Sequence, residues 1–192
     1  MYRIIAGKWK AKKILAPKHF DVRPTTDFAK EALFSILENK YDMISSSVLD
    51  LFAGIGSITF EFASRGCEDV TSVELNPKHI AFINTTATEL GMQLQINTQR
   101  GDVYDWLKKF RNKKSYEIIF ADAPFETDEK KYQELISLVI HNKYLKPNGV
   151  LIIEHQSRMK LDHPNYLETR KYGNVAFSFY RPNDEEHTDQ EN

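Results

Sequence analysis

A regular alternation of apolar strands and helical segments across residues 47–156 constrains the fold of this chain more than any other feature. Short runs rich in Val, Ile, Leu and Phe are separated by longer stretches in which apolar residues recur at helical spacing. We expect strands at 47–53, 69–75, 94–102, 116–122 and 149–156, and helices at 56–66, 77–91, 103–110 and 130–145. Strands this apolar must be buried on both faces, which predicts a mainly parallel, doubly wound α/β sheet.

The two ends of the chain depart from this alternation. Residues 166–181 are expected to form two strands around Gly173–Asn174, which would add an antiparallel hairpin and bring the sheet to seven strands. Residues 2–17 have the pattern of two short strands around Gly7, and residues 23–40 that of a helix. The expected buried stripe of this helix consists of Phe28, Ala32, Leu33, Ile36 and Leu37.

Charge is distributed unevenly along the chain. The net charge is −1, but residues 183–192 hold five of the 27 acids and no Lys or Arg, which leaves 26 basic against 22 acidic residues elsewhere. Residues 1–23 hold seven Lys or Arg and one acid, Asp21. A basic arm that includes an aromatic residue favours nucleic-acid binding over a merely solvated hairpin face. The candidate RNA contacts are Arg3, Lys8, Trp9, Lys10, Lys12, Lys13 and Arg23.

These patterns predict three segments and a cellular compartment. The segments are a basic arm at 1–23, an α/β domain at 24–182 and an acidic, disordered tail at 183–192. Cys67 is the only cysteine, so no disulfide framework exists and a reducing compartment is expected. No stretch approaches the roughly 18 apolar residues of a membrane span. We therefore expect a cytoplasmic protein.

The first strand of the alternation runs into a glycine turn, Gly54-Ile55-Gly56. Glycines between a strand and a helix let the backbone approach a ligand closely. The turn lacks the Gly-Lys-Ser/Thr of a P-loop, and Thr59 stands where a dinucleotide fingerprint would have a third Gly or Ala. Asp50 precedes the glycines and would suit a ligand with an ammonium group, although a loop cap is the alternative role.

Further acids follow at the ends of successive strands. Glu74 lies 20 residues after Gly54, where NAD sites and S-adenosylmethionine sites both hydrogen-bond a ribose. Asp102 and Asp122 end the third and fourth strands. An acidic edge would repel a phosphate ligand, whereas S-adenosylmethionine is cationic at sulfur and carries an ammonium group. The pattern therefore favours S-adenosylmethionine as cofactor.

The fourth strand ends in Asp122-Ala123-Pro124-Phe125. In one interpretation this is only a turn, because Asp and Pro are common turn residues. In the other, the Asp122 carboxylate and the Ala123 carbonyl accept hydrogen bonds from an exocyclic amine that is being methylated. Phe125 would then stack on a base taken out of its helix. The neighbouring acids and glycines favour the methylating site.

These motifs together resemble those of the bacterial small-subunit ribosomal RNA guanine-N2 methyltransferases of the RsmD type, over almost the whole chain to about residue 182. "RIIAGKWKAKKI" is similar to the family's basic hairpin, "RPTTDFAKEALFSIL" to its first long helix, and "RKYGNVAFSFY" to its closing hairpin. "VLDLFAGIGS" is similar to its cofactor motif, and "FADAPF" stands where the family has Asp-Pro-Pro-Tyr/Phe. Ala123 thus replaces the first proline of that motif and keeps the carbonyl acceptor.

The resemblance implies a Rossmann-like class I methyltransferase that moves a methyl group from S-adenosylmethionine to a guanine N2 amine in 16S ribosomal RNA. It implies a substrate within assembled or assembling small subunits. Independently of the resemblance, we expect a monomer, and no metal site, because the six His show no metal-ligand spacing. The implied cofactor residues are Thr25, Asp50, Phe52, Gly54, Gly56, Glu74, Leu75, Asp102 and Val103. The implied catalytic residues are Asp122, Ala123, Pro124 and Phe125.

Several alternatives remain open at this stage. A DNA adenine-N6 methyltransferase uses similar acid-x-Pro-aromatic sites but needs a target-recognition domain, for which this chain has little room. A ribosome-assembly protein with weak or no catalysis, and an NAD oxidoreductase, are further alternatives. Thr25 and Thr26 could serve only as helix caps, and Glu154 and His155 are more readily explained by structure than by catalysis.

Overall fold

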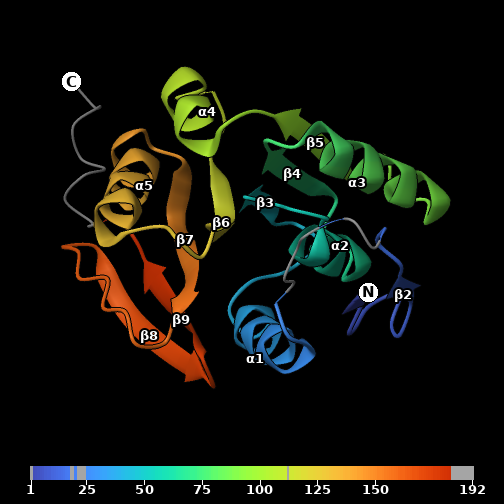
Figure 1. The fold of residues 1–192 in the computed structure, drawn as a ribbon, viewed down its shortest axis with the longest axis horizontal. Coiled ribbons are helices and arrows are strands. Elements are labelled where there is room, and N and C mark those ends of the chain that lie inside the picture. Colours follow the sequence, from blue (N-terminus) through green and yellow to red (C-terminus); the bar gives the residue numbers. More distant parts are fainter. Residues whose placement is uncertain (1, 18–19, 21–24, 112, 183–192) are drawn as a thin grey trace.

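The computed structural model describes residues 2–17, 20, 25–111 and 113–182, which form a seven-stranded sheet flanked by helices (Figure 1). The sheet contains β3 (Ser47–Leu51), β4 (Asp69–Glu74), β5 (Ile96–Arg100), β6 (Tyr116–Asp122), β7 (Leu145–Gln156), β8 (Tyr166–Tyr172) and β9 (Val175–Tyr180). The helices are α1 (Asp27–Glu38), α2 (Ser57–Ser64), α3 (Pro77–Glu89), α4 (Val103–Lys109) and α5 (Glu129–His141). A separate two-stranded sheet pairs β1 (Tyr2–Arg3) with β2 (Lys13–Ile14).

The strand order of the large sheet is β5-β4-β3-β6-β7-β9-β8. All pairs from β5 to β7 are parallel, and β9 pairs antiparallel with both β7 and β8. The predicted doubly wound sheet with an antiparallel C-terminal hairpin is therefore confirmed. The chain runs outward from β3 to β5 and then returns to β6 on the other side of β3. Ligands of such sheets bind at this reversal, beside the carboxyl ends of the strands.

Helices cover both faces of the sheet, each over its own apolar core (Figure 1). Leu33, Phe60 and Ile83 bring α1, α2 and α3 onto one core, whereas Trp106 and Leu135 bring α4 and α5 onto the other. Successive residues of each central strand point to opposite cores, which is why these strands are apolar throughout. Within the described ranges, no helix is both long and apolar enough to cross a membrane.

The expected buried stripe of α1 is wrong at its first position. Phe28 is 68% exposed, and the buried residues are Ala29, Lys30, Leu33, Phe34 and Leu37. Thr26 caps the helix by accepting a hydrogen bond from the Ala29 amide at 3.2 Å. The buried face of α1 therefore includes Lys30. This burial is tolerated because a buried acid on α2 neutralises the lysine's charge.

The N-terminal segment forms a shorter hairpin than expected, since β1 and β2 pair over two residues each. Between them the backbone lies directly on α2. Gly7 adopts a φ of 81°, and a Cβ there would sit 1.9 Å from the Ser64 carbonyl oxygen. The segment is thus fixed against α2, and only Gly fits at this point of contact.

Candidate active site

The glycine turn leaves β3 through three residues with left-handed backbone angles. Phe52, Gly54 and Gly56 have φ values of 61°, 54° and 80°. A Cβ on Gly54 would meet nothing closer than 4.0 Å, so its position faces open space where a ligand could approach. A Cβ on Gly56 would lie 2.9 Å from the Phe60 ring and 3.1 Å from Ile83, so helix packing requires this second glycine.

Glu74, at the end of β4, holds the glycine turn from the side. Its Oε2 accepts a hydrogen bond from the Gly54 amide at 2.8 Å, and its Oε1 accepts one from the Asn76 amide at 2.7 Å. The His79 Nδ1 lies 3.5 Å from the same Oε1. The neighbouring Leu75 is exposed. A carboxylate oxygen has room for further donors, so Glu74 can orient the turn and still accept from a ribose hydroxyl.

Asp50 is buried inside β3 and is not a loop cap. Its Oδ2 accepts a hydrogen bond from the Thr59 hydroxyl at 2.5 Å, and Thr59 also lies 2.8 Å from the Ser72 hydroxyl. Burial raises the pKa of Asp50 to about 7, against the opposing effect of the Thr59 hydrogen bonds. Thr59, which stands in place of a third glycine, therefore has a role of its own: it joins α2 to this carboxyl group.

Asp102 caps α4, where its Oδ1 accepts hydrogen bonds from the Tyr104 and Asp105 amides at 2.9 and 3.1 Å. The adjacent Val103 is buried in the core under α4. The Phe52 and Tyr104 rings lie edge to face, 6.1 Å apart. These contacts bring the start of α4 beside the glycine turn, although capping alone accounts for the bonds that Asp102 makes.

Two carboxyl groups lie side by side at the reversal of the sheet. Asp122 of β6 and Glu154 of β7 are direct register partners on parallel strands. The Thr25 hydroxyl donates a hydrogen bond to Glu154 Oε2 at 2.6 Å, so Thr25 is not the cap of α1. Desolvation, then Glu154 and Asp50, raise the pKa of Asp122 well above its usual value. Desolvation likewise raises the pKa of Glu154 to about 7.

The segment after Asp122 leaves the sheet as the sequence predicts, because β6 ends at that residue. Ala123 is buried, whereas Pro124 is exposed and Phe125 is 65% exposed. The side chain of Gln156 donates a hydrogen bond to the Phe125 carbonyl at 3.4 Å. Along this segment, a desolvated carboxyl group and a backbone carbonyl are thus followed closely by an exposed aromatic ring.

His155 is the residue of β7 that follows Glu154, and it belongs to a chain of hydrogen bonds with a structural role. Its Nε2 lies 2.7 Å from the Ser178 hydroxyl, which lies 2.7 Å from the Thr169 hydroxyl. Its Nδ1 lies 2.9 Å from the Gln156 carbonyl. Burial lowers the pKa of His155, so the ring is neutral at neutral pH and links β7, β9 and β8. Its side chain points to the opposite face of the sheet from that of Glu154.

The candidate RNA-binding residues of the basic arm divide into two groups. The exposed ones are Arg3, Lys8, Lys10, Lys12 and Lys13. Arg3 pairs with Asp27 at 2.6 Å, and Lys8 Nζ lies 5.6 Å from the centroid of the Trp9 ring. Trp9 itself is half-buried and packs against the main core. Arg23 lies outside the described residues.

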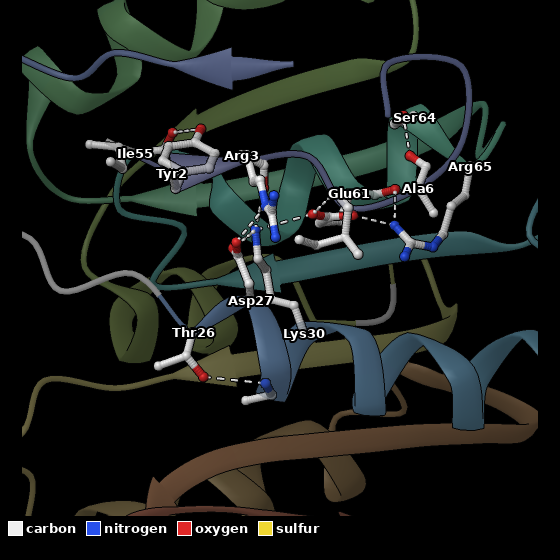
Figure 2. Close-up of polar contacts among 12 residues, drawn as sticks. Tyr2, Arg3, Ala6, Thr26, Asp27, Lys30, Ile55, Glu61, Ser64 and Arg65 are labelled. Carbon is white, nitrogen blue, oxygen red and sulfur yellow. Dashed lines mark hydrogen bonds and ion pairs between the residues drawn. The ribbon is translucent and has the colours of Figure 1, made fainter. Parts of the chain in front are cut away.

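A buried ionic cluster, which the sequence did not suggest, fixes this arm to the domain (Figure 2). Glu61 of α2 and Lys30 of α1 have fully buried side chains with 3.1 Å between Oε1 and Nζ. Glu61 Oε1 also accepts from the Ile5 amide at 2.8 Å, and Lys30 donates to the Arg3 carbonyl at 2.7 Å. Arg65 pairs with the other Glu61 oxygen.

Comparison with known proteins places this geometry in a family. Residues 2–181 match the sequence profile described as "Conserved hypothetical protein 95". The Ribosomal RNA small subunit methyltransferase D of Buchnera aphidicola subsp. Baizongia pistaciae is 33% identical, over 93% of this chain and 90% of its own length. The protein of the same name from Haemophilus influenzae is 32% identical, over 93% of each. The solved structure of Escherichia coli yhhF superposes with a TM-score of 0.79 at 25% identity, over 93% of this chain and 96% of its own. This chain therefore belongs to the RsmD family, which the profile describes and which includes the small subunit methyltransferases D.

Proposed function

We propose that this protein transfers a methyl group from S-adenosylmethionine to the N2 amine of a guanine in 16S ribosomal RNA. The observation that carries the proposal is the position of Asp122-Ala123-Pro124-Phe125 at the end of β6. This segment lies beside the glycine turn of β3, where doubly wound sheets bind their ligands. A desolvated acceptor, a backbone carbonyl and an exposed ring suit a planar base with an exocyclic amine.

The residues at this edge fit S-adenosylmethionine. The backbone at Gly54 faces open space, Glu74 can accept from a ribose, and Asp50 would add negative charge opposite a cationic ligand when it is ionised. No Lys or Arg stands in the glycine turn to attract a phosphate instead. When bound, the cofactor supplies an electrophilic methyl group on a positively charged sulfur. Its charge would favour the ionised forms of the nearby carboxyl groups.

The protein's part in the chemistry is to hold the amine and stabilise the charge that develops on it. Asp122 and the Ala123 carbonyl accept the two N–H bonds, which fixes the nitrogen lone pair toward the methyl group. Phe125 stacks on the base and keeps it out of its helix. The amine must lose a proton after methylation, and the paired carboxyl groups Asp122 and Glu154 are placed to accept it.

The basic arm supports an RNA substrate. The acidic edge would by itself repel a polyanion, and the exposed lysines of the arm supply an opposing attraction. The relatives named Ribosomal RNA small subunit methyltransferase D support ribosomal RNA of the small subunit as the substrate class.

The proposal can be tested with labelled S-adenosylmethionine and three substrates: small subunits lacking the modification, naked 16S RNA, and DNA. We expect label on guanine in the small subunits, recovered as N2-methylguanosine after digestion. Label on adenine of DNA would support the alternative methyltransferase instead. Absence of transfer to all three, despite cofactor binding, would support a binding protein without catalysis.

A salt titration tests the role of the arm. If Lys10, Lys12 and Lys13 contact phosphates, replacing all three with Ala should flatten the slope of log K against log salt by about 2 units, since each lost contact removes ~0.7–0.9. The matched control replaces Lys109, Lys113 and Lys130, exposed lysines near α4 and α5, and changes the net charge equally. Equal slopes for the two triple variants, measured by subunit binding, would show that the arm is only a solvated face.

The pH dependence of methyl transfer tests the pairing of Asp122 with Glu154. The ionised Asp122 carboxylate accepts its N–H bond of the amine more strongly than the neutral acid does, and its pKa is raised, so the single-turnover rate should increase with pH through neutrality. Glu154→Gln removes a neighbouring negative charge, which lowers the pKa of Asp122. The rise in rate should therefore move to lower pH in this variant. A profile with an unchanged midpoint would mean that the two carboxyl groups titrate independently.

A further inference from the structure

The first strand of the basic arm reaches the glycine turn through one buried side chain. The Tyr2 hydroxyl donates a hydrogen bond to the Ile55 carbonyl at 2.8 Å, and Ile55 stands between Gly54 and Gly56 (Figure 2). Tyr2 is 5% exposed, and burial raises the pKa of its hydroxyl well above the usual value, so it remains a donor. The arm thus contacts the backbone of the proposed cofactor turn directly.

The polar groups of this turn are fixed from several directions. The Ala53 amide donates to the Val73 carbonyl of β4 at 3.0 Å, and the Gly54 amide donates to Glu74. The Gly56 amide donates to the Ala53 carbonyl at 2.8 Å. Tyr2 fixes the Ile55 carbonyl, between two residues in left-handed conformations. Because glycines are conformationally free, a turn of this kind keeps its shape through such outside contacts.

The rest of the arm is attached to the helix that begins at the turn. The Lys8 amide donates a hydrogen bond to the Ser64 carbonyl of α2 at 2.7 Å. The Trp9 amide donates one to the Ser64 hydroxyl at 3.0 Å. The Ser64 hydroxyl donates to the Ala6 carbonyl at 2.7 Å. Glu61 accepts from the Ile5 amide. The arm therefore contacts both ends of one continuous segment, which consists of the glycine turn followed by α2.

We propose that Tyr2 is a positioning residue for the cofactor turn, through which the RNA-binding arm and the cofactor site stabilise one another. The proposal rests on the proposed function, since it takes the turn as the S-adenosylmethionine site and the arm as an RNA contact. RNA bound to the arm would add to the contacts that hold Ile55 in place for the cofactor. By linkage, cofactor binding would strengthen RNA binding by the same factor.

Tyr2→Phe tests this inference, with Tyr144→Phe as the matched control. Tyr144 is also buried and donates from its hydroxyl to a backbone carbonyl, that of Leu107, at 2.9 Å, in the core under α4 and α5. We expect Tyr2→Phe to weaken binding of S-adenosylhomocysteine about 5-fold by calorimetry, the effect of one lost hydrogen bond. Tyr144→Phe should lower the melting temperature comparably and leave that affinity unchanged.

The coupling is measured in the same proteins by titrating small subunits with and without S-adenosylhomocysteine. The wild type should bind subunits more tightly with the ligand, and Tyr2→Phe should reduce that gain while Tyr144→Phe retains it. If Tyr2→Phe matches Tyr144→Phe in both ligand affinity and coupling, the inference is overturned. If the wild type fails to bind S-adenosylhomocysteine at all, the proposed function fails instead, so the two failures are distinguishable.

Discussion

Replacing Asp122 with Ala should reduce methyl transfer by about 100-fold or more while S-adenosylhomocysteine affinity and subunit affinity stay nearly unchanged. The carboxylate is proposed to bind the amine most strongly when positive charge develops on nitrogen, so its loss raises the barrier more than it weakens ground-state binding. The measurement is a single-turnover rate with saturating cofactor and unmodified small subunits, beside calorimetry of cofactor binding.

The matched control for this prediction is Glu126→Ala, because Glu126 is an exposed acid four residues after Asp122, in the loop that follows β6. It removes the same charge from the same segment without touching the register pair of Asp122 and Glu154. A loss of rate confined to Asp122→Ala would assign the effect to the acceptor position. Equal rates in both variants would mean that Asp122 only ends the strand, as its place before Ala-Pro allows.

The fold could be predicted from the sequence because its signal is periodic and repeated. Each central strand is buried on both faces, so each produces an uninterrupted apolar run, and the intervening helices show 3.6-residue spacing. Because parallel strands end at one edge of the sheet, the strand pattern also predicts that the strand-end acids lie close together. The contact of Glu74 with Gly54 and the register of Asp122 with Glu154 illustrate this. The antiparallel hairpin at the end of the sheet is predicted from the same kind of pattern, because two strand-like runs meet at Gly173–Asn174 with no helix between them.

Contacts that depend on side chains far apart in the sequence could not be predicted. Nothing in the spacing pairs Lys30 with Glu61, or Tyr2 with Ile55, although these contacts fix the arm to the domain. Lys30 could have been suspected, since it lies one turn before Phe34 on the face of α1 that is buried. The predicted stripe instead lies closer to Phe28, because an aromatic residue contributes more to an apolar pattern than a lysine does.

The second large effect is expected from Glu61→Gln, which should destabilise the folded protein by about 3–5 kcal/mol. The Glu61 and Lys30 side chains are both 0% exposed, and that of Arg65 is 4% exposed. Glutamine keeps the size of the side chain and removes the only fully buried negative charge of the cluster shown in Figure 2. Lys30 would then keep only the partly exposed Asp27 carboxylate, at 3.8 Å, and Arg65 only that of Glu38, at 2.7 Å. Both cations would lose their buried partner, which is costly for a desolvated charge.

Urea unfolding would measure this loss, and Glu134→Gln is the control. Glu134 also pairs with two cations, Lys108 at 2.9 Å and Lys131 at 2.8 Å, but at the surface, where water screens the charges. The same change of charge there should move the unfolding midpoint little. If Glu61→Gln also moved it little, Asp27 and Glu38 would be sufficient partners for Lys30 and Arg65, and Glu61 would contribute little to stability.

A triple variant separates the cost of a broken pair from the value of the pair itself. Replacing Lys30 and Arg65 with Met and Glu61 with Leu removes every charge from the buried cluster, so no cation is left desolvated. Such exchanges are often neutral or stabilising, so the triple variant should recover most of the stability lost in Glu61→Gln. It would also lose the hydrogen bond that the Ile5 amide donates to Glu61 and the one that Lys30 donates to the Arg3 carbonyl, which attach the arm. We therefore expect a stable domain whose arm is protected less from amide hydrogen exchange, because the charges of this cluster fix the arm's position more than they stabilise the fold.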